Sequence, residues 1–190
     1  MQHNALEVFF ELLVWFYLSP KVRMTSQKPS QMPDSRVAIR LAQPADAAKI
    51  TTLINTAFHI AEGFFVDGPR LDQSEVEQKL RKGNFLLAEA DGKLNGCVYV
   101  EMRGERSYLG LLSVDPDCQK GGLGSLLMSE AEEHCRSRGS QFMDILIVSV
   151  RKELSPFYQH RGYTQTGTTP FEESVETKMP VHFINMSKPL

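Results

Sequence analysis

The sequence has few cysteines and histidines, and neither type is clustered. Cys97, Cys118 and Cys135 are the three cysteines among 190 residues, and they form no Cys-x-x-Cys pair. An odd number of isolated cysteines is typical of proteins from reducing compartments, so we expect no disulfide framework and a cytoplasmic location. The five histidines have no metal-ligand spacing, so the sequence predicts no metal site.

An excess of one charge is also absent. The formal net charge is −2, so nothing in the composition indicates the basic surface that nucleic-acid binding requires. The sequence has no internal repeats and no low-complexity tracts. A length of 190 residues suits one domain with a full hydrophobic core rather than two domains.

The chain lacks a hydrophobic run that could span a membrane. Its most apolar segment, residues 6–18, has 13 residues and is interrupted by Glu7 and Glu11, whereas a spanning helix needs about 20. The segment has neither the basic start nor the cleavage site of a signal peptide. We therefore expect no membrane partner.

A polar, proline-bearing linker separates this apolar segment from the rest of the chain. The linker covers residues 24–35 and has the composition of a disordered segment. The sequence therefore predicts an N-terminal segment with its linker over residues 1–35 and a domain over residues 36–190. A translation start at Met24 is favoured over a docking or anchoring role for the first 23 residues, because no targeting pattern fits.

The most informative pattern that is present is a glycine-rich stretch, in which Gln119 and Lys120 precede three glycines. Residues 108–114 predict a strand before it, and a helix that Gly139 ends follows it. One face of this helix carries Leu123, Leu126, Leu127, Ala131 and Cys135. The first N–H groups of a helix have no intrahelical partner, and the macrodipole adds positive charge there. The sequence therefore predicts a pyrophosphate-binding loop.

The order of residues in the loop narrows the kind of pyrophosphate. A dinucleotide-binding loop needs glycines in another register and an acidic ribose partner, and an ATP-binding loop ends in Gly-Lys-Ser/Thr. Neither pattern is present. The Gln-x-x-Gly-x-Gly pattern of residues 119–124, after a Val-Asp-Pro strand exit, resembles the coenzyme A pyrophosphate loop of the GNAT-type N-acyltransferase superfamily.

A second signature follows the strand that residues 142–149 predict. A short helix has Leu154, Phe157 and Tyr158 at helical spacing and ends before Gly162. It resembles the Tyr-x-x-x-Gly-Tyr/Phe helix of the same family, which flanks the thiol of the cofactor. Two signatures in the right order are more specific than either alone, and the resemblance covers about residues 36–190.

Hydrophobic periodicity predicts the elements before the glycine loop. Residues 36–41 alternate as an edge strand, and Pro44 opens a helix. The apolar face of this helix carries Ile50, Leu53, Ile54, Ala57 and Phe58. A loop over residues 59–72 leads to a second helix, which a Ser74/Glu77 capping box begins and Gly83 ends.

The remaining strands complete a mixed sheet. Strands over residues 85–90 and 94–101 flank a hairpin turn at residues 91–93, and strands over 163–168 and 182–186 follow the second signature. The order β-α-α-β-β-β-α-β-α-β-β predicts an α/β (α+β mixed sheet) fold with helices on both faces. It is also the order of the acyl-CoA N-acyltransferase (GNAT) fold that the resemblance implies.

The resemblance implies that acetyl-CoA is the co-substrate. The strands over residues 108–114 and 142–148 would part, and the exposed backbone of the first would pair with the pantetheine arm. Transfer would be direct, with no acyl-enzyme, so Cys118 is read as a loop residue. Arg151 departs from the family, because many members have an asparagine there. The residues expected to bind acetyl-CoA are Leu112, Ser113, Val114, Gln119, Lys120, Gly121, Gly122, Leu123, Gly124, Ser125, Arg151 and Ser155.

Tyr158 is the leading catalytic candidate, because a phenol can give a proton or a hydrogen bond to the departing thiolate. The alternative is that it is a packing residue. The general base is less clear. Some family members carry Glu or His on the strand that leads into the loop, and Tyr108 occupies that place here. Glu101 is the second candidate, although a solvated carboxylate at a strand end is favoured over a base there.

The acceptor is expected to lie against the loop over residues 59–70, because long loops in compact domains are often binding loops. Phe64 and Phe65 could wall a pocket, and Arg70 could pair with a carboxylate. Hydrophobic core for the phenylalanines and solvated surface for the arginine are the alternatives.

These features predict an N-acetyltransferase that moves an acetyl group from acetyl-CoA to a primary amine of a small molecule or peptide, in a ternary complex. The alternative is a non-catalytic acyl-CoA-binding or regulatory module on the same fold. The expected partner is the amine, with no nucleic acid; the sequence leaves a homodimer open.

Overall fold

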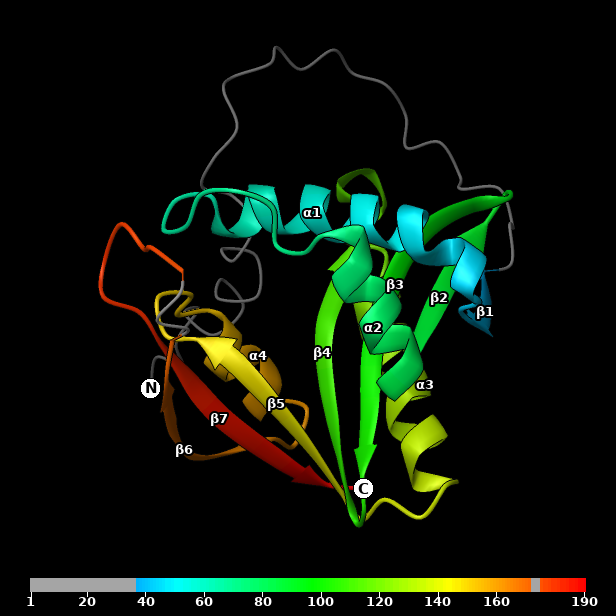
Figure 1. Cartoon of the computed structure of the whole chain (residues 1–190). Helices are drawn as coiled ribbons and strands as arrows, with labels where there is room; N and C mark the ends of the chain where they lie inside the picture. Colours follow the sequence, from blue (N-terminus) through cyan, green and yellow to red (C-terminus); the bar gives the residue numbers. More distant parts are fainter. Residues whose placement is uncertain (1–36, 172–174) are drawn as a thin grey trace, which may run out of the picture. The chain divides into compact units, whose positions relative to one another are not determined.

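The computed structural model describes residues 37–171 and 175–190 (Figure 1). The apolar segment at residues 6–18, the linker at 24–35 and the start at Met24 lie outside the described residues. Within the described ranges, no helix is both long and apolar enough to cross a membrane. The elements are β1 (Ala38–Leu41), α1 (Ala47–Glu62), α2 (Gln73–Lys82), β2 (Asn84–Ala90), β3 (Lys93–Arg103), β4 (Arg106–Val114), α3 (Leu123–Arg136), β5 (Phe142–Val148), α4 (Leu154–Gln159), β6 (Thr164–Pro170) and β7 (His182–Pro189), with 3-10 turns at Pro44–Asp46 and Pro116–Cys118.

The predicted order of helices and strands is confirmed, and so is the mixed sheet. The seven strands lie in the order β1-β2-β3-β4-β5-β7-β6, and β4 and β5 are the parallel neighbours in it. The β2–β3 hairpin forms as expected: Asp91 and Gly92 have φ values of 54° and 74°, as a two-residue turn with two left-handed residues requires.

Helices cover both faces of the sheet, which explains why β2 is apolar throughout. Successive side chains of a strand point to opposite faces. Phe85 and Leu87 belong to the core cluster beneath α1 and α2. Leu86 and Ala88 belong to the cluster beneath α3. The burial of both faces therefore removes the alternation between apolar and polar residues that an exposed sheet would show.

The two parallel strands at the centre of the sheet separate along their length, as predicted. β4 pairs with β5 only where Arg106–Tyr108 lies beside Phe142–Asp144. Figure 1 shows the two strands meeting at the bottom of the view and spreading apart toward α1, which crosses the open end. We call the space between the diverging strands the wedge.

Two predictions near the first helices are wrong in detail. α1 does not end before the predicted loop but continues to Glu62, where the Gly63 N–H still donates to the His59 carbonyl. The capping box of α2 is built by Asp72 and Glu75 rather than by Ser74 and Glu77. Asp72 accepts from the Glu75 N–H at 2.8 Å, and Glu75 accepts from the Asp72 N–H at 2.7 Å. A carboxylate caps a helix as well as a hydroxyl does.

The predicted apolar face of α3 is one residue too wide. Leu123, Leu127, Ala131 and Cys135 are buried in the core, whereas Leu126 is 38% exposed. The buried residues recur every four positions, and Leu126 lies on the margin of that stripe.

A buried charge pair joins α3 to the last strand. Glu132 is 8% exposed. Its carboxylate accepts hydrogen bonds from the Tyr163 hydroxyl at 3.0 Å and from the Lys188 ammonium at 2.6 Å. Removing one partner of a buried pair leaves an uncompensated charge, which is costly.

We expect Lys188→Met to lower the free energy of unfolding by about 3 kcal/mol, because it strands the Glu132 carboxylate. Urea denaturation would measure the loss. Lys49→Met is the matched control, since Lys49 is exposed, and it should stay within about 0.5 kcal/mol of the unmodified protein. An equal loss in both variants would contradict a role for the buried pair.

Candidate active site

The glycine loop forms a backbone cradle at the start of α3. Lys120 and Gly122 have positive φ values of 74° and 79°, and the Gln119 side-chain amide donates to the Val114 carbonyl at 3.1 Å. The helix ladder begins with the Leu126 N–H, which donates to the Gly122 carbonyl at 3.0 Å. The N–H groups of residues 123–125 therefore precede the ladder, at the positive end of the helix dipole.

The glycines leave space above this cradle. A Cβ atom on Gly122 would meet no atom within 4 Å, and one on Gly124 would meet only Val114 Cγ2, at 3.7 Å. For Gly121 the nearest atom would be the Cys118 carbonyl oxygen, at 3.9 Å. The loop is therefore an open, positively polarised cradle that fits a bulky anion such as a pyrophosphate.

β4 presents an unpaired backbone edge to the wedge. A bulge at Leu111, whose φ is 53°, places two residues of β4 opposite one residue of β3. In the described part of the chain, β4 has no strand partner on its β5 side beyond Tyr108. The Ser113 side chain is buried and its hydroxyl donates to the Leu111 carbonyl, so this residue can offer only its backbone to a ligand. An extended group can bind such an edge as an added strand does.

Tyr158 lies near the C-terminal end of α4 and is 8% exposed. Its ring packs edge-on against Phe157 and Tyr163, at centroid distances of 5.0 Å and 5.6 Å. Burial raises the pKa of Tyr158 to about 12, although the positive charges of Arg151 and Arg161 oppose the shift. The phenol therefore keeps its proton at neutral pH and is suited to act as an acid.

Neither base candidate from the sequence has the environment of a base. Glu101 accepts hydrogen bonds from the Arg103 Nε at 3.0 Å and from the Tyr99 hydroxyl at 3.1 Å. The bond from Arg103 holds the pKa of Glu101 below its usual value, which weakens it as a base. Tyr108 is half-buried, and the Arg103 guanidinium lies 4.8 Å from its ring centroid.

The three residues assigned to the acceptor differ in their exposure and contacts. Phe64 is 50% exposed, whereas Phe65 is fully buried and its ring lies 5.1 Å from that of Phe64. Phe65 therefore supports the exposed Phe64 from the core. The Arg70 guanidinium lies 5.6 Å from the ring centroid of Phe58. The Asn55 side chain fixes this part of the loop by accepting from the Arg70 N–H at 2.8 Å.

Of the residues assigned to the cofactor, Arg151 lies just before α4 and Ser155 lies on it. Arg151 is held by Glu153, whose carboxylate accepts from its Nε at 2.8 Å. Ser155 is half-buried on the first turn of α4. Burial raises the pKa of both Tyr158 and Glu62, and the positive charge of Arg151 partly opposes the shift in each.

Sequence reasoning missed two residues that the fold brings to this site. Arg161 donates from Nη2 to the Ser125 hydroxyl at 2.5 Å and lies 3.7 Å from the Phe157 ring centroid. This places a guanidinium beside the start of α3. No sequence signal indicates it, because 36 residues separate the two partners.

Glu62 is the second missed residue, and it is 8% exposed. Within residues 37–171 and 175–190, its carboxylate makes no hydrogen bond or ion pair, and burial raises its pKa. A sequence signal did exist: Glu62 continues the buried stripe of Ile50, Ile54 and Phe58 at four-residue spacing. The predicted loop start at residue 59 concealed it.

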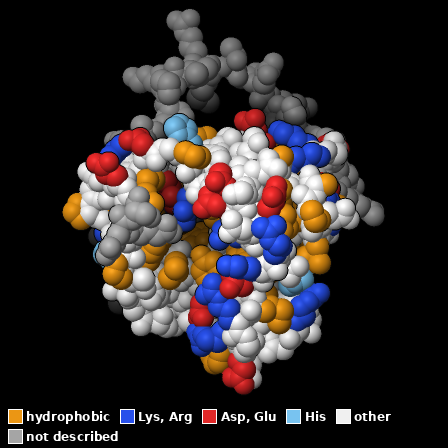
Figure 2. Space-filling view, in the orientation of Figure 1, with side chains coloured by type: hydrophobic (Ala, Val, Ile, Leu, Met, Phe, Trp, Pro, Cys, Tyr) orange, Lys and Arg blue, Asp and Glu red, His pale blue; other side chains and the backbone are white. Residues whose placement is uncertain are grey.

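The surface over the wedge is apolar. Leu146 on β5 is 41% exposed, while its neighbours Ile145 and Ile147 are buried on the other face. Figure 2 shows hydrophobic side chains around a hollow in this region. Such a surface suits a long organic arm with few charges.

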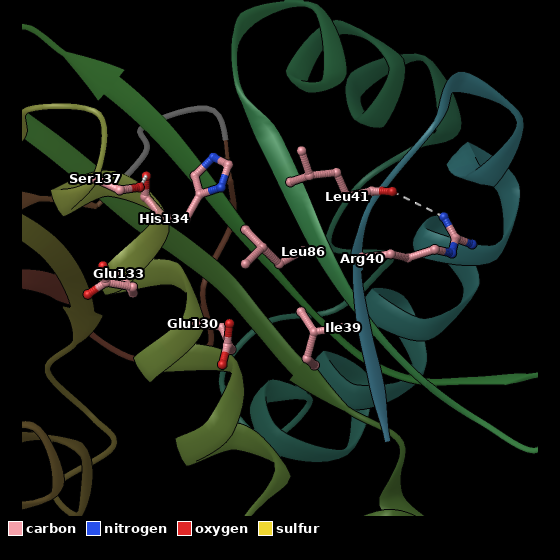
Figure 3. Close-up of a pocket in the computed structure, with 8 residues that line it drawn as sticks. All are labelled: Ile39, Arg40, Leu41, Leu86, Glu130, Glu133, His134 and Ser137. Carbon is pink, nitrogen blue, oxygen red and sulfur yellow. Dashed lines mark hydrogen bonds between the residues drawn. The ribbon is translucent and has the colours of Figure 1, made fainter. Parts of the chain in front are cut away.

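A separate cavity of about 260 Å³ lies elsewhere, between β1, β2 and α3. Figure 3 shows that α3 supplies its polar wall and that Ile39 and Leu86 supply its apolar wall. It is lined by Ile39, Arg40, Leu41, Leu86, Glu130, Glu133, His134 and Ser137. None of the residues of the glycine loop or of α4 lines it, so it is not part of the wedge site.

Comparisons with known proteins agree with this geometry. Over 136 residues the chain is 29% identical to mycothiol acetyltransferase from Clavibacter sepedonicus. The matched region covers 70% of this chain and 44% of that relative. The ribosomal-protein-alanine N-acetyltransferase of Brucella melitensis superposes with a TM-score of 0.66 at 21% identity, over 80% of this chain and 99% of that one. The yncA protein of Salmonella typhimurium was solved with its cofactor acetyl-CoA. It superposes with a TM-score of 0.63 at 22% identity, over 82% of this chain and 95% of that one.

These solved structures share the fold at low identity, and the family assignment rests on a separate match. The model of the acetyltransferase (GNAT) domain matches residues 63–188. This range contains the glycine loop, the open edge of β4 and the α4 signature, and it makes up most of the described chain. The chain therefore belongs to the GNAT acetyltransferase family.

Proposed function

We propose that this protein transfers the acetyl group of acetyl-CoA directly to a primary amine of a small molecule or peptide. The observation that carries the proposal is the placement of three groups around one wedge. These are the open cradle at Gly121–Gly124, the unpaired edge of β4, and the buried, protonated phenol of Tyr158.

Each group has a distinct role toward acetyl-CoA. The cradle would hold the pyrophosphate, and Arg161 would add a positive charge beside it. The backbone of residues 112–114 would pair with the pantetheine arm. Acetyl-CoA supplies a thioester, whose carbonyl carbon an amine can attack without a covalent enzyme intermediate. Tyr158 would then give a proton to the departing sulfur.

The acceptor amine must be neutral when it attacks. At pH 7.4 a lysine side chain with a pKa of about 10.4 costs about 4 kcal/mol to deprotonate, whereas an α-amine with a pKa of about 7.8 is already partly neutral. The mycothiol and ribosomal-protein relatives are named for different acceptors. We favour an amine of low pKa, such as the α-amine of a peptide.

An assay of thiol release from acetyl-CoA against a panel of amines tests this proposal. The panel pairs a peptide with a free α-amine and the same peptide with a blocked terminus and a free lysine. We expect faster release with the free α-amine and little release without any amine. Tight binding of acetyl-CoA with no release on any amine would instead identify a non-catalytic acyl-CoA-binding module.

A further inference from the structure

Glu62 is an outlier among the carboxylates of this protein. It occupies a position on α1 where the helix packs on the sheet, and the preceding stripe positions hold Ile50, Ile54 and Phe58. The residue is 8% exposed, and burying a carboxylate costs free energy that a leucine there would avoid. Such groups are concentrated at functional sites. The position of Glu62 therefore needs an explanation beyond packing.

The position of Glu62 in the fold relates it to the wedge. It ends α1, the helix that crosses the open end between β4 and β5 (Figure 1). The charge of Arg151, at the start of the α4 segment, acts on the pKa of both Glu62 and Tyr158. Glu62 ends a helix whose apolar residues belong to the core cluster on one face of the sheet, whereas Tyr158 belongs to the cluster on the other face.

The loop that follows Glu62 is fixed by the segment before β7. The Lys178 ammonium donates to the Gly63 carbonyl at 2.9 Å and to the Asp67 carboxylate at 2.7 Å. The Lys178 N–H donates to the Phe65 carbonyl at 2.8 Å, and Thr177 forms a bridge with Val66. These contacts hold the end of α1 in place, so the Glu62 carboxylate is presented by a constrained backbone.

We propose that Glu62 is the general base that deprotonates the acceptor amine; the inference rests on the proposed acetyl transfer. The charged groups that act on its carboxylate are Arg70 after α1 and Arg151 before α4. The Lys178 ammonium donates to the carbonyl of the next residue, Gly63. Arg70 and Arg151 favour its ionised form, and burial opposes it more strongly. A carboxylate whose pKa is raised toward neutrality is a better base than a solvated one.

The proton balance of the transfer is complete with these two residues. A substrate ammonium carries three protons on nitrogen. The first passes to the Glu62 carboxylate and later to solvent, which frees the nitrogen electron pair. That pair forms the bond to the thioester carbon, the carbon–sulfur bond breaks, and its electron pair leaves on sulfur. The second proton reaches sulfur by way of the Tyr158 hydroxyl, and the third stays on the amide nitrogen.

We expect Glu62→Gln to lower kcat on a good amine by about 100-fold or more, as loss of a general base does. The pH profile is the decisive readout. The unmodified protein should gain activity as pH rises through the raised pKa of Glu62, above the usual carboxyl value of about 4.3. The variant should lose this rise in activity, which is the acid limb of the pH profile. Its activity should depend instead on the pKa of the amine. Glu62→Asp should keep the limb, with a lower kcat.

Stability separates this role from a structural one. Since the folded state raises the pKa of Glu62, its ionised form destabilises the fold at neutral pH, and Glu62→Gln should keep or raise Tm. Glu105→Gln is the matched control, because Glu105 is exposed in the β3–β4 turn, beside the closed end of the wedge. It should leave kcat, the acid limb and Tm unchanged.

Three outcomes would overturn the inference while leaving the proposed function intact. One is a Glu62→Gln variant that keeps both kcat and the acid limb. Another is a raised KM with unchanged kcat, which would make Glu62 a binding residue for the ammonium group. The third is a Tm loss that accounts for the activity loss. If the unmodified protein releases no thiol with any amine, the proposed function fails instead.

Discussion

Tyr158→Phe is expected to lower kcat by about 100-fold or more and to leave the affinity for acetyl-CoA nearly unchanged. The hydroxyl matters when negative charge develops on sulfur, so its loss raises the barrier without weakening ground-state binding. Burial raises the pKa of Tyr158 to about 12. The acid therefore loses its proton only as pH rises toward that value, and no basic limb from this residue is expected at neutral pH. Steady-state kinetics and calorimetry measure the two effects.

Tyr163→Phe is the matched control for this substitution. Tyr163 is the other tyrosine of the α4 signature and is also buried, but its hydroxyl donates to Glu132 at 3.0 Å. Its loss should cost about 1 kcal/mol of stability and leave kcat within a few-fold. If Tyr158→Phe keeps full kcat on a substrate whose chemical step limits the rate, Tyr158 is a packing residue and the proton reaches sulfur by another route.

Gly122→Glu is expected to weaken acetyl-CoA binding by at least about 100-fold, or about 2.8 kcal/mol. The space over Gly122 is empty to 4 Å, so the new side chain fits the fold but occupies the volume that the pyrophosphate needs. Its negative charge would also take the place of the ligand at the start of α3. Calorimetry with acetyl-CoA measures the loss.

Gly139→Glu, at the other end of α3, controls for backbone strain. Gly139 has a φ of 95°, and a Cβ there would also meet no atom within 4 Å. Both substitutions place a side chain in left-handed backbone, at a cost of about 1–2 kcal/mol. The control should therefore show a similar fall in Tm and unchanged affinity. Undiminished affinity in folded Gly122→Glu would contradict the cradle as the pyrophosphate site.

The local features of this fold were predictable because they depend on residues close in sequence. The turn between β2 and β3 follows from Asp91 and Gly92, and the start of α3 follows from a glycine loop before an apolar stripe. The parallel pair β4–β5 and its separation came only from the family resemblance. Nothing in the sequence of β4 or of β5 alone determines how far the two strands pair, and so how much of the β4 edge stays free.

The errors concern competition between neighbouring signals. Asp72, Ser74 and Glu75 all lie at the start of α2. Asp72 caps the helix because its backbone is extended and its carboxylate accepts from the Glu75 N–H. The predicted loop began at His59, but α1 continues for four more residues, to Glu62. Capping depends on backbone geometry that composition does not specify.

The sequence by itself determined the glycine-rich turn before α3, the position of Tyr158 on a short helix and the order of the elements, because each rests on spacing within about one turn or one hairpin. Only the tertiary structure decided the electrostatics of the site. It buried Tyr158 and so raised its pKa, paired Glu101 with Arg103, brought Arg161 to Ser125, and buried Glu62 and so raised its pKa. A pKa depends on burial and on charges from distant segments, and these are set by how helices pack on the sheet.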